Sequence, residues 1–367
     1  MSFSAADHGF MTRALQLAQR GLNTATPNPR VGCVMVRDGK AIGEGWHEKA
    51  GGPHAEAAAL AQIVGAGDTA VGATAYVTLE PCSHFGRTPP CADALIEAGV
   101  ARVVAAMQDP NPLVAGQGLA RISAAGIEVA SGLLVAEARE LNIGFVSRMT
   151  RGRPWLRLKV AASLDGKTAL NNGVSQWITG PDARRDAHAW RARSCAVLTG
   201  IGTVKDDNPR LTVREVAAPR QPLKVVIDSR LETPADAAVL DGGNVLIVAA
   251  QDDPARSAAL RARGAEIVFL PNAQGKVELP ALLQELGRRG INEVLAEAGT
   301  RLNGSLLREG CVDELLIYQA PMLIGDAARG MFGLAELTEL AGVCRLNIIE
   351  RRSVGADFRI RARLGQA

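Results

Sequence analysis

The first half of the chain alternates segments of helical periodicity with short apolar segments typical of strands. Residues 1–20 form an amphipathic helical pattern, and a Gly-Lys turn separates apolar runs at 31–36 and 41–46. The pattern then predicts an Ala-rich helix at 55–64, a buried strand at 73–79, a helix at 92–98 and a strand at 102–106. Strands that alternate with helices predict a layered α/β domain.

A polar stretch at residues 148–154, with three Arg, one Gly and one Pro, interrupts this pattern. We therefore expect a first domain at residues 1–149 and a second at 150–367. The strands predicted after the break lie at 155–161, 196–199, 223–227, 245–249, 266–270, 293–296, 314–320 and 358–364, and the helices at 182–193, 254–263, 279–289 and 302–309. This renewed alternation predicts a second α/β domain.

Composition and charge narrow the class of protein. The 367 residues suit two domains of ordinary size, and the net charge is only +3, without the clustered basic residues of a nucleic-acid-binding face. We find neither a secretory signal pattern nor an apolar run near the ~20 residues that span a membrane. The six cysteines then suggest free thiols or metal ligands. We expect a cytoplasmic protein without membrane or nucleic-acid partners.

Three residues with the chemistry of zinc ligands stand at predicted element ends. His54 opens the Ala-rich helix, Cys82 follows the strand ending at residue 79, and Cys91 begins the next helix. One imidazole and two thiolates suit Zn²⁺ and leave a fourth position for water. Glu56 would take a proton from this water and deliver it to departing ammonia. A His-x-Glu pair, a Pro-Cys pair and a second Cys match the known pattern of zinc-dependent nucleobase deaminases.

Two alternatives to a catalytic zinc deaminase of small molecules stay open at this point. A structural zinc site would normally recruit a fourth protein ligand, and Glu56 would then have no role. A nucleic-acid editing deaminase would share the fold, but it predicts a basic, aromatic-lined groove for a flipped base. The near-neutral charge and the two Tyr in the chain argue against such a groove.

Longer motifs resemble the bifunctional deaminase–reductases of riboflavin biosynthesis. They are Thr26-Pro27-Asn28-Pro29-Arg30-Val31-Gly32, Gly51-Gly52-Pro53-His54-Ala55-Glu56, and the stretch from Pro81 to Cys91, which separates the cysteines further than in most deaminases. The resemblance implies a cytidine-deaminase-like domain that converts 2,5-diamino-6-(5-phosphoribosylamino)pyrimidin-4-one to the corresponding uracil. Asn28 and His84 would bind this substrate, and Arg87, His47 and Asn111 are further candidates.

The second domain is similar to the dihydrofolate-reductase-like half of the same family, through residues 158–167 and 175–180. Glycine turns at 200–203 and 297–305 follow apolar strands, and the second enters a helix. Such turns present bare backbone N–H groups and a helix dipole to phosphate. Since the third glycine of the Rossmann fingerprint is missing, the cofactor need not lie as in Rossmann domains. The resemblance implies NADPH as the cofactor.

The similarity implies two sets of binding residues, carried over position by position. NADPH would be bound by Ala161, Trp177, Thr203, Asp207, Ser229, Gly299, Thr300, Arg301, Leu302, Asn303, Gly304 and Ser305. The phosphorylated pyrimidine would be bound by Lys159, Ser175, Arg191, Leu211, Arg214 and Glu297. Arg230 could grip the 2′-phosphate, and Lys159 and Asp207 are candidates for proton transfer, with an ordinary surface ion pair as the alternative.

The implied reductase reaction is hydride transfer from NADPH to C1′ of the ribosylamine, which opens the ribose to a ribityl chain. We also expect the chain to form a homo-oligomer. The alternative for this half is a ligand-binding or oligomerisation module that lacks reductase activity. Consumption of NADPH with the deaminated intermediate would separate the two.

Overall fold

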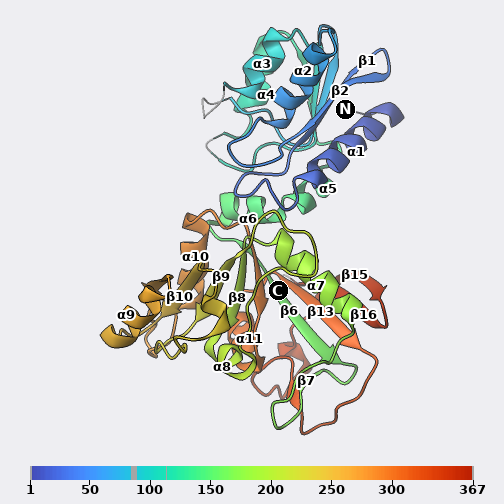
Figure 1. Ribbon diagram of the computed structural model, residues 1–367. Helices are drawn as coiled ribbons and strands as arrows, with labels where there is room; N and C mark the ends of the chain where they lie inside the picture. The colour runs from blue at the N-terminus through green and yellow to red at the C-terminus, as the bar shows by residue number, and fades with distance from the viewer. Residues whose placement is uncertain (1, 84–88, 113, 366–367) are drawn as a thin grey trace. The chain divides into compact units, whose positions relative to one another are not determined.

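The computed structural model describes residues 2–83, 89–112 and 114–365, and the chain divides into two compact units, Met1–Gly152 and Arg153–Ala367 (Figure 1). The stretch predicted as a linker is largely helical, because α6 (Ile143–Arg151) continues through it. The predicted boundary between residues 149 and 150 therefore falls inside this helix. Within the described ranges, no helix is long and apolar enough to cross a membrane.

A five-stranded sheet forms the middle layer of the N-terminal unit, in the order β2-β1-β3-β4-β5. Its strands are β1 (Gly32–Arg37), β2 (Lys40–Trp46), β3 (Thr74–Val77), β4 (Arg102–Ala105) and β5 (Glu128–Ser131). β1 runs antiparallel to β2 and β3, whereas β3, β4 and β5 are parallel. Segments that follow β3 and β4 therefore leave the same edge of the sheet.

Helices cover both faces of this sheet. On one face, α1 (Ala5–Arg20), α5 (Val135–Leu141) and α6 bury an apolar cluster, and on the other α2 (Ala55–Gly65), α3 (Cys91–Glu97) and α4 (Gln117–Ala124) bury a second one. α2 lies directly on β2 at Gly45, where an added Cβ would come within 2.3 Å of the Ala55 carbonyl oxygen. This close approach fixes the start of α2, which carries His54 and Glu56.

The C-terminal unit contains a nine-stranded sheet in the order β11-β10-β9-β8-β12-β6-β13-β16-β15. Its strands are β6 (Trp155–Ser163), β8 (Ala196–Gly200), β9 (Leu223–Ile227), β10 (Val245–Ala249), β11 (Ala265–Phe269), β12 (Glu293–Glu297), β13 (Glu314–Ala320), β15 (Leu346–Val354) and β16 (Asp357–Leu364). The strands from β11 to β13 are parallel, and β16 and β15 add an antiparallel edge.

This sheet also has helices on both faces. α7 (Pro181–Arg193), α8 (Ile201–Asp207) and α9 (Pro254–Ala262) pack on one face, and α10 (Leu279–Arg288) and α11 (Thr300–Arg308) on the other. Short elements complete the unit: the paired strands β7 (Lys167–Ala169) and β14 (Arg329–Gly330), and the 3₁₀ turns η1 (Ala238–Leu240) and η2 (Leu340–Gly342). The carboxyl ends of the parallel strands meet at one edge, where α/β proteins commonly bind ligands.

Candidate functional site

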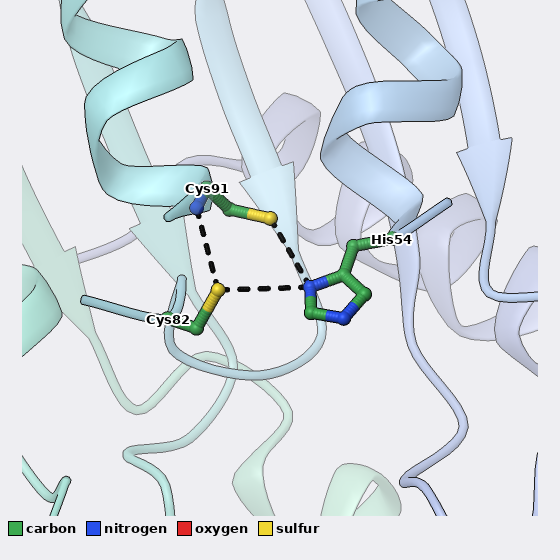
Figure 2. A group of neighbouring side chains, drawn as sticks. All are labelled: His54, Cys82 and Cys91. Atoms are coloured by element: carbon green, nitrogen blue, oxygen red, sulfur yellow. Dashed lines mark hydrogen bonds between the residues drawn. The ribbon is translucent and has the colours of Figure 1, made fainter. Parts of the chain in front are cut away.

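The three predicted zinc ligands come together at the starts of α2 and α3 (Figure 2). Nδ1 of His54 lies 3.6 Å from Sγ of Cys82 and 3.3 Å from Sγ of Cys91. The three ligand atoms all lie within 4.8 Å of one another, and no fourth side chain of the described residues joins this group. Since zinc binds nitrogen and sulfur at about 2.0–2.3 Å, these atoms fit one tetrahedral ion with an open position.

Two hydrogen bonds hold Cys82 next to Cys91 at the start of α3. Cys91 is the first residue of α3, and its backbone N–H donates to Sγ of Cys82 at 3.3 Å. The next N–H, of Ala92, donates to the Cys82 carbonyl oxygen at 3.1 Å. The start of α3 thus faces the Cys82 sulfur, and N–H groups at a helix start favour a thiolate there.

Hydrogen bonds within the site shift the pKa values of the two thiols in opposite directions. The hydrogen bond from Cys91, assisted by His54, lowers the pKa of Cys82 to about 4. The hydrogen bond to Cys82, together with burial, raises the pKa of Cys91. A bound zinc ion would hold both sulfurs as thiolates, because coordinating thiols lose their protons.

Glu56 lies in the first turn of α2, two residues after the His54 ligand. Its side chain is buried, with only 3% of the residue exposed. Burial raises the pKa of Glu56 to about 7, and the charge of the Cys82 thiolate acts in the same direction. A carboxyl group with a pKa near neutrality can both accept and release a proton, which suits the predicted role in general acid–base catalysis.

Asn28 reaches the zinc site through His47. Nδ1 of His47 lies 2.9 Å from the Pro53 carbonyl oxygen, so Nδ1 carries the hydrogen, and Nε2 accepts from the Asn28 amide at 3.0 Å. The His47 ring packs edge-on against the His54 ring with centroids 5.4 Å apart. Burial lowers the pKa of His47, in keeping with a neutral ring. The structure therefore connects Asn28 to His54 through His47, whereas His84 and Arg87 lie outside the described residues.

Glu80 anchors the segment that carries Cys82, and sequence reasoning missed it. The carboxylate of this buried residue accepts four backbone N–H bonds, from Asp109 (3.0 Å), Gly116 (2.9 Å), Gly118 (2.9 Å) and Leu119 (3.3 Å). Gly118 packs so closely that an added Cβ would lie 1.8 Å from the Pro81 carbonyl oxygen. An acidic residue between a buried strand and the Pro-Cys pair was the only sequence signal for this anchor.

The C-terminal unit has a cavity of about 1960 Å³ at the carboxyl ends of β6, β8, β9 and β12. The following predicted residues line it: Lys159, Ala161, Ser175, Trp177, Arg191, Thr203, Asp207, Leu211, Arg214, Ser229, Arg230, Glu297, Gly299, Thr300, Arg301 and Leu302. The structure thus brings nearly all the residues carried over for the cofactor and the pyrimidine to one cavity.

Three predicted cofactor residues are not part of this lining. Asn303 donates its side-chain amide to the Met331 carbonyl oxygen at 3.0 Å and is buried. A Cβ on Gly304 would come within 2.2 Å of the Gly333 carbonyl oxygen, and the Ser305 hydroxyl accepts from Arg308 at 3.0 Å. The structure places all three in α11 beyond its first turn, where the helix has already turned away from the cavity.

Two glycine turns end neighbouring parallel strands. Gly200 is the last residue of β8 and directly precedes α8. Gly299 follows β12 and directly precedes α11, and β8 pairs with β12. Because the strands are parallel neighbours, both turns lie at the same edge of the sheet. The start of α11 supplies N–H groups that suit a phosphate of the cofactor.

Glu297 at the end of β12 is held by two cations. Arg191 donates from Nε to Oε1 of Glu297 at 2.5 Å and from Nη2 to Oε2 at 3.0 Å. Nζ of Lys159 lies 3.9 Å from Oε2. Burial alone would raise the pKa of Glu297, but the charges of Arg191 and Lys159 lower it to about 2. Burial lowers the pKa of Lys159. This group is therefore a largely buried cluster in the cavity wall, not a surface ion pair.

One further hydrogen bond and one further residue belong to the cavity lining. Ser175 donates from its hydroxyl to the Asp207 carboxylate at 3.3 Å, and burial raises the pKa of Asp207. His188 also lines the cavity, and sequence reasoning did not single it out. Its signal was its place three residues before Arg191, on the same face of the predicted helix.

Known proteins match both units. Residues 4–107 match the family model of the cytidine and deoxycytidylate deaminase zinc-binding region, and residues 154–359 match that of the RibD C-terminal domain. The riboflavin biosynthesis protein RibD of Escherichia coli is 50% identical over 364 residues, covering 96% of this chain and 97% of that protein. RibD of Haemophilus influenzae is 48% identical over 373 residues, covering 98% of each.

Solved structures give the same result. Acinetobacter baumannii RibD superposes with a TM-score of 0.90 and 43% identity, covering 98% of this chain and 99% of that one. A Thermotoga maritima diaminohydroxyphosphoribosylaminopyrimidine deaminase/5-amino-6-(5-phosphoribosylamino)uracil reductase superposes with a TM-score of 0.87 and 33% identity, with the same coverage. The predicted α/β fold, a cytidine-deaminase-like domain followed by a dihydrofolate-reductase-like domain, is confirmed. The chain belongs to the RibD family of bifunctional riboflavin-biosynthesis deaminase/reductases.

Proposed function

We propose that this chain deaminates 2,5-diamino-6-(5-phosphoribosylamino)pyrimidin-4-one with zinc and then reduces 5-amino-6-(5-phosphoribosylamino)uracil with NADPH. The observation that carries the proposal is the convergence of His54, Cys82 and Cys91 next to Glu56. The Thermotoga maritima relative is named for both reactions. The alternative of a C-terminal module without reductase activity is not favoured, because a reductase-family domain covers residues 154–359.

For deamination we assign each residue of the zinc site a role. His54, Cys82 and Cys91 would hold zinc. The ion would lower the pKa of a bound water, so that hydroxide is available at neutral pH to attack the amino-bearing ring carbon. Glu56 takes a proton from this water and passes it to the amino group, which leaves as ammonia. Asn28, oriented by His47, hydrogen-bonds the pyrimidine. His84 remains a proposed substrate residue.

For reduction we assign the cavity of the C-terminal unit. NADPH supplies the hydride. The first turn of α11, from Gly299 to Leu302, binds a cofactor phosphate, and the remaining lining residues carried over for NADPH are Ala161, Trp177, Thr203, Asp207 and Ser229. Ser175, Arg191, Leu211, Arg214 and Glu297 hold the ribosylaminouracil. Lys159 and Asp207 are the proposed donors of the proton that the ribose ring oxygen needs when its bond to C1′ breaks.

The whole proposal is tested by incubating the chain with the diaminopyrimidine phosphate and measuring product masses. Without NADPH, we expect only the product in which an amino group is replaced by oxygen. With NADPH, this product should gain the hydride and a proton, and the ring-opened ribityl compound should accumulate. Unchanged substrate in both reactions would contradict the proposal, and deamination without NADPH oxidation would contradict its second half.

The cofactor preference is expected to depend on Arg230. Arg230 lies in the cavity lining after Ser229 and contacts the carboxylate of Glu232 at 2.9 Å, which Lys205 also contacts. Since charged hydrogen bonds contribute about 1.5–3 kcal/mol and this site is largely exposed, Arg230→Ala should weaken NADPH binding about tenfold. NADH binding should change little. Arg263→Ala, an exposed arginine paired with Asp241, is the matched control. Equal losses for both cofactors would place the 2′-phosphate elsewhere.

The proposal includes a homo-oligomer. The antiparallel edge of the nine-stranded sheet exposes apolar side chains on β15 and on its neighbour β16, namely Leu346 (43% exposed), Ile348 (52%) and Phe358 (51%). An exposed, apolar edge strand is a ready template for pairing with another chain. Light scattering on the intact chain should give a multiple of the monomer mass, and a monomer at micromolar concentration would contradict this. A cytoplasmic location and the absence of nucleic-acid partners stay predictions.

A further inference from the structure

His188 on α7 is a histidine of the cavity wall with a fixed tautomer. It is 7% exposed, and its Nδ1 accepts a hydrogen bond from the backbone N–H of Arg214 at 3.2 Å. Because a backbone N–H only donates, Nδ1 carries no hydrogen, and the hydrogen of the neutral ring lies on Nε2. Burial and the charges of Arg191 and Arg214 lower the pKa of His188 to about 4, so the ring stays neutral at neutral pH.

The residues around His188 form a cationic part of the cavity. Arg191, Arg210 and Arg214 line it together with Glu215 and Glu297. Arg191 pairs with Glu297, and the three arginines outnumber the two glutamates in this part of the lining. Burial and the positive charges of Arg191 and Arg210 lower the pKa of Arg214. A dianionic phosphate is the chemical group that such a cluster would bind.

α7 also holds the segment that carries Arg214. Arg191 donates from Nη1 to the Thr212 carbonyl oxygen at 3.0 Å, and His188 accepts from the Arg214 backbone two residues later. Arg214 in turn donates from Nη1 to the Thr212 hydroxyl at 3.0 Å. His188 and Arg191 thus hydrogen-bond the backbone on either side of Val213. These two bonds hold the backbone from which the Arg214 side chain extends.

We propose that His188 is a specificity residue of the reductase site, which positions Arg214 through Nδ1 and donates its Nε2–H to the phosphate of the substrate. This inference rests on the proposed function, which places a phosphorylated ribosylaminouracil in this cavity. A phosphate offers only hydrogen-bond acceptors, and a neutral ring adds a donor without adding repulsion to the arginines. The tautomer set by Arg214 therefore makes His188 selective for an acceptor-only group.

Two substitutions separate the two nitrogens of the ring. His188→Asn keeps a side-chain oxygen near the Nδ1 position but is too short to place a donor at Nε2. His188→Gln reaches the Nε2 position with its amide but lacks the acceptor for the Arg214 N–H. Each variant is assayed for reduction of 5-amino-6-(5-phosphoribosylamino)uracil and of the same compound without its phosphate, with kcat and KM measured separately.

We expect His188→Asn to raise KM for the phosphorylated compound about ten- to hundredfold, the range of a lost hydrogen bond to a charged group, with a smaller change in kcat. KM for the dephosphorylated compound should stay nearly constant, so the preference for phosphate falls. His188→Gln keeps the donor but loses the acceptor that positions Arg214, so it should retain part of that preference, more than His188→Asn does. NADPH binding and deamination should be unchanged in both variants. The matched control is His8→Asn, at an exposed position of α1.

The outcomes distinguish this inference from the function on which it rests. If the unmodified chain reduces both compounds with equal KM, the phosphate does not bind in this cavity and the proposed substrate placement is wrong. If the unmodified chain prefers the phosphorylated compound and His188→Asn keeps that full preference, the role of His188 is wrong while the proposed function stands. Loss of NADPH binding in both variants would make His188 a residue of the general fold and would also overturn the inference.

Discussion

Replacing Cys82 with serine is expected to remove zinc from the chain and to abolish deamination, while reduction of the supplied uracil intermediate continues. The sulfur of Cys82 accepts the backbone N–H of Cys91 at the start of α3, and its thiolate is the more favoured of the two. A serine hydroxyl is a poor zinc ligand at neutral pH, because it does not deprotonate as a thiol does. Two remaining ligands, His54 and Cys91, should not retain the ion through gel filtration.

The measurement is zinc per chain by elemental analysis, together with both activities. Cys344→Ser is the matched control, because Cys344 is an exposed free cysteine that should not affect zinc or either activity. Zinc content undiminished in Cys82→Ser would contradict the ligand assignment. A zinc-free variant whose N-terminal unit is unfolded by circular dichroism would instead favour a structural zinc site.

Spacing and element ends were enough to predict that His54, Cys82 and Cys91 come together, and the reason is physical. His54 and Cys91 stand at helix starts and Cys82 follows a strand, so the ends of α2, α3 and β3 set their positions. Sheets fix such ends because neighbouring strands share hydrogen bonds and a common edge. The sequence order therefore already contained most of the geometry of the site.

Residues that act through the backbone of distant segments could not be predicted in this way. Glu80 accepts N–H groups from segments 29 to 39 residues away, and His188 accepts one 26 residues away. Neither contact has a periodicity or a motif, because the partner is a backbone group that every residue carries. The roles of Glu80 and His188 can be recognised only from the three-dimensional structure of the segments that they hydrogen-bond.

The pattern-based prediction missed α4, β5, α5 and α8, and two further differences have a clear physical reason. Residues 148–151 belong to α6 instead of a linker, because Phe145 and Val146 are buried by the core while the arginines that follow take the outer side of the same helix. β15 was not predicted, because its side chains are mostly exposed on both faces and so lack the alternation that a half-buried strand shows. In the first case the polar composition wrongly indicated a linker. In the second the strand lies at the edge of the sheet, where exposure of both faces removes the hydrophobic pattern.

Replacing Glu56 with glutamine is expected to stop deamination while zinc stays bound and reduction stays intact. Glutamine matches glutamate in shape, so α2 and the His54 ligand at its start should keep their places. The amide cannot accept the proton of the attacking water or deliver it to the leaving amine. General acid–base catalysis contributes about 10²–10⁴-fold for one transfer, and Glu56 would serve more than one, so the loss should reach or exceed the upper end of this range.

Because Glu56 is buried, its replacement by a neutral amide should change deamination without destabilising the fold. Glu56 is only 3% exposed, and burial raises its pKa to about 7, so a neutral amide in the same space removes a charge that the fold disfavours. We therefore expect no loss of stability in Glu56→Gln and a melting temperature at or above that of the unmodified chain. Glu48→Gln, an exposed glutamate of the same unit, is the matched control and should leave both activities unchanged.

Three measurements on Glu56→Gln test the role of Glu56 and whether the two reactions use separate sites. They are zinc content, deamination of the diamino substrate, and NADPH oxidation with the deaminated intermediate. Deamination near the unmodified rate would show that another group moves the proton. Loss of zinc would make Glu56 part of the metal site instead of a proton carrier. Loss of NADPH oxidation would mean that the two reactions do not use separate sites, since every residue assigned to reduction lies beyond Gly152 in the C-terminal unit.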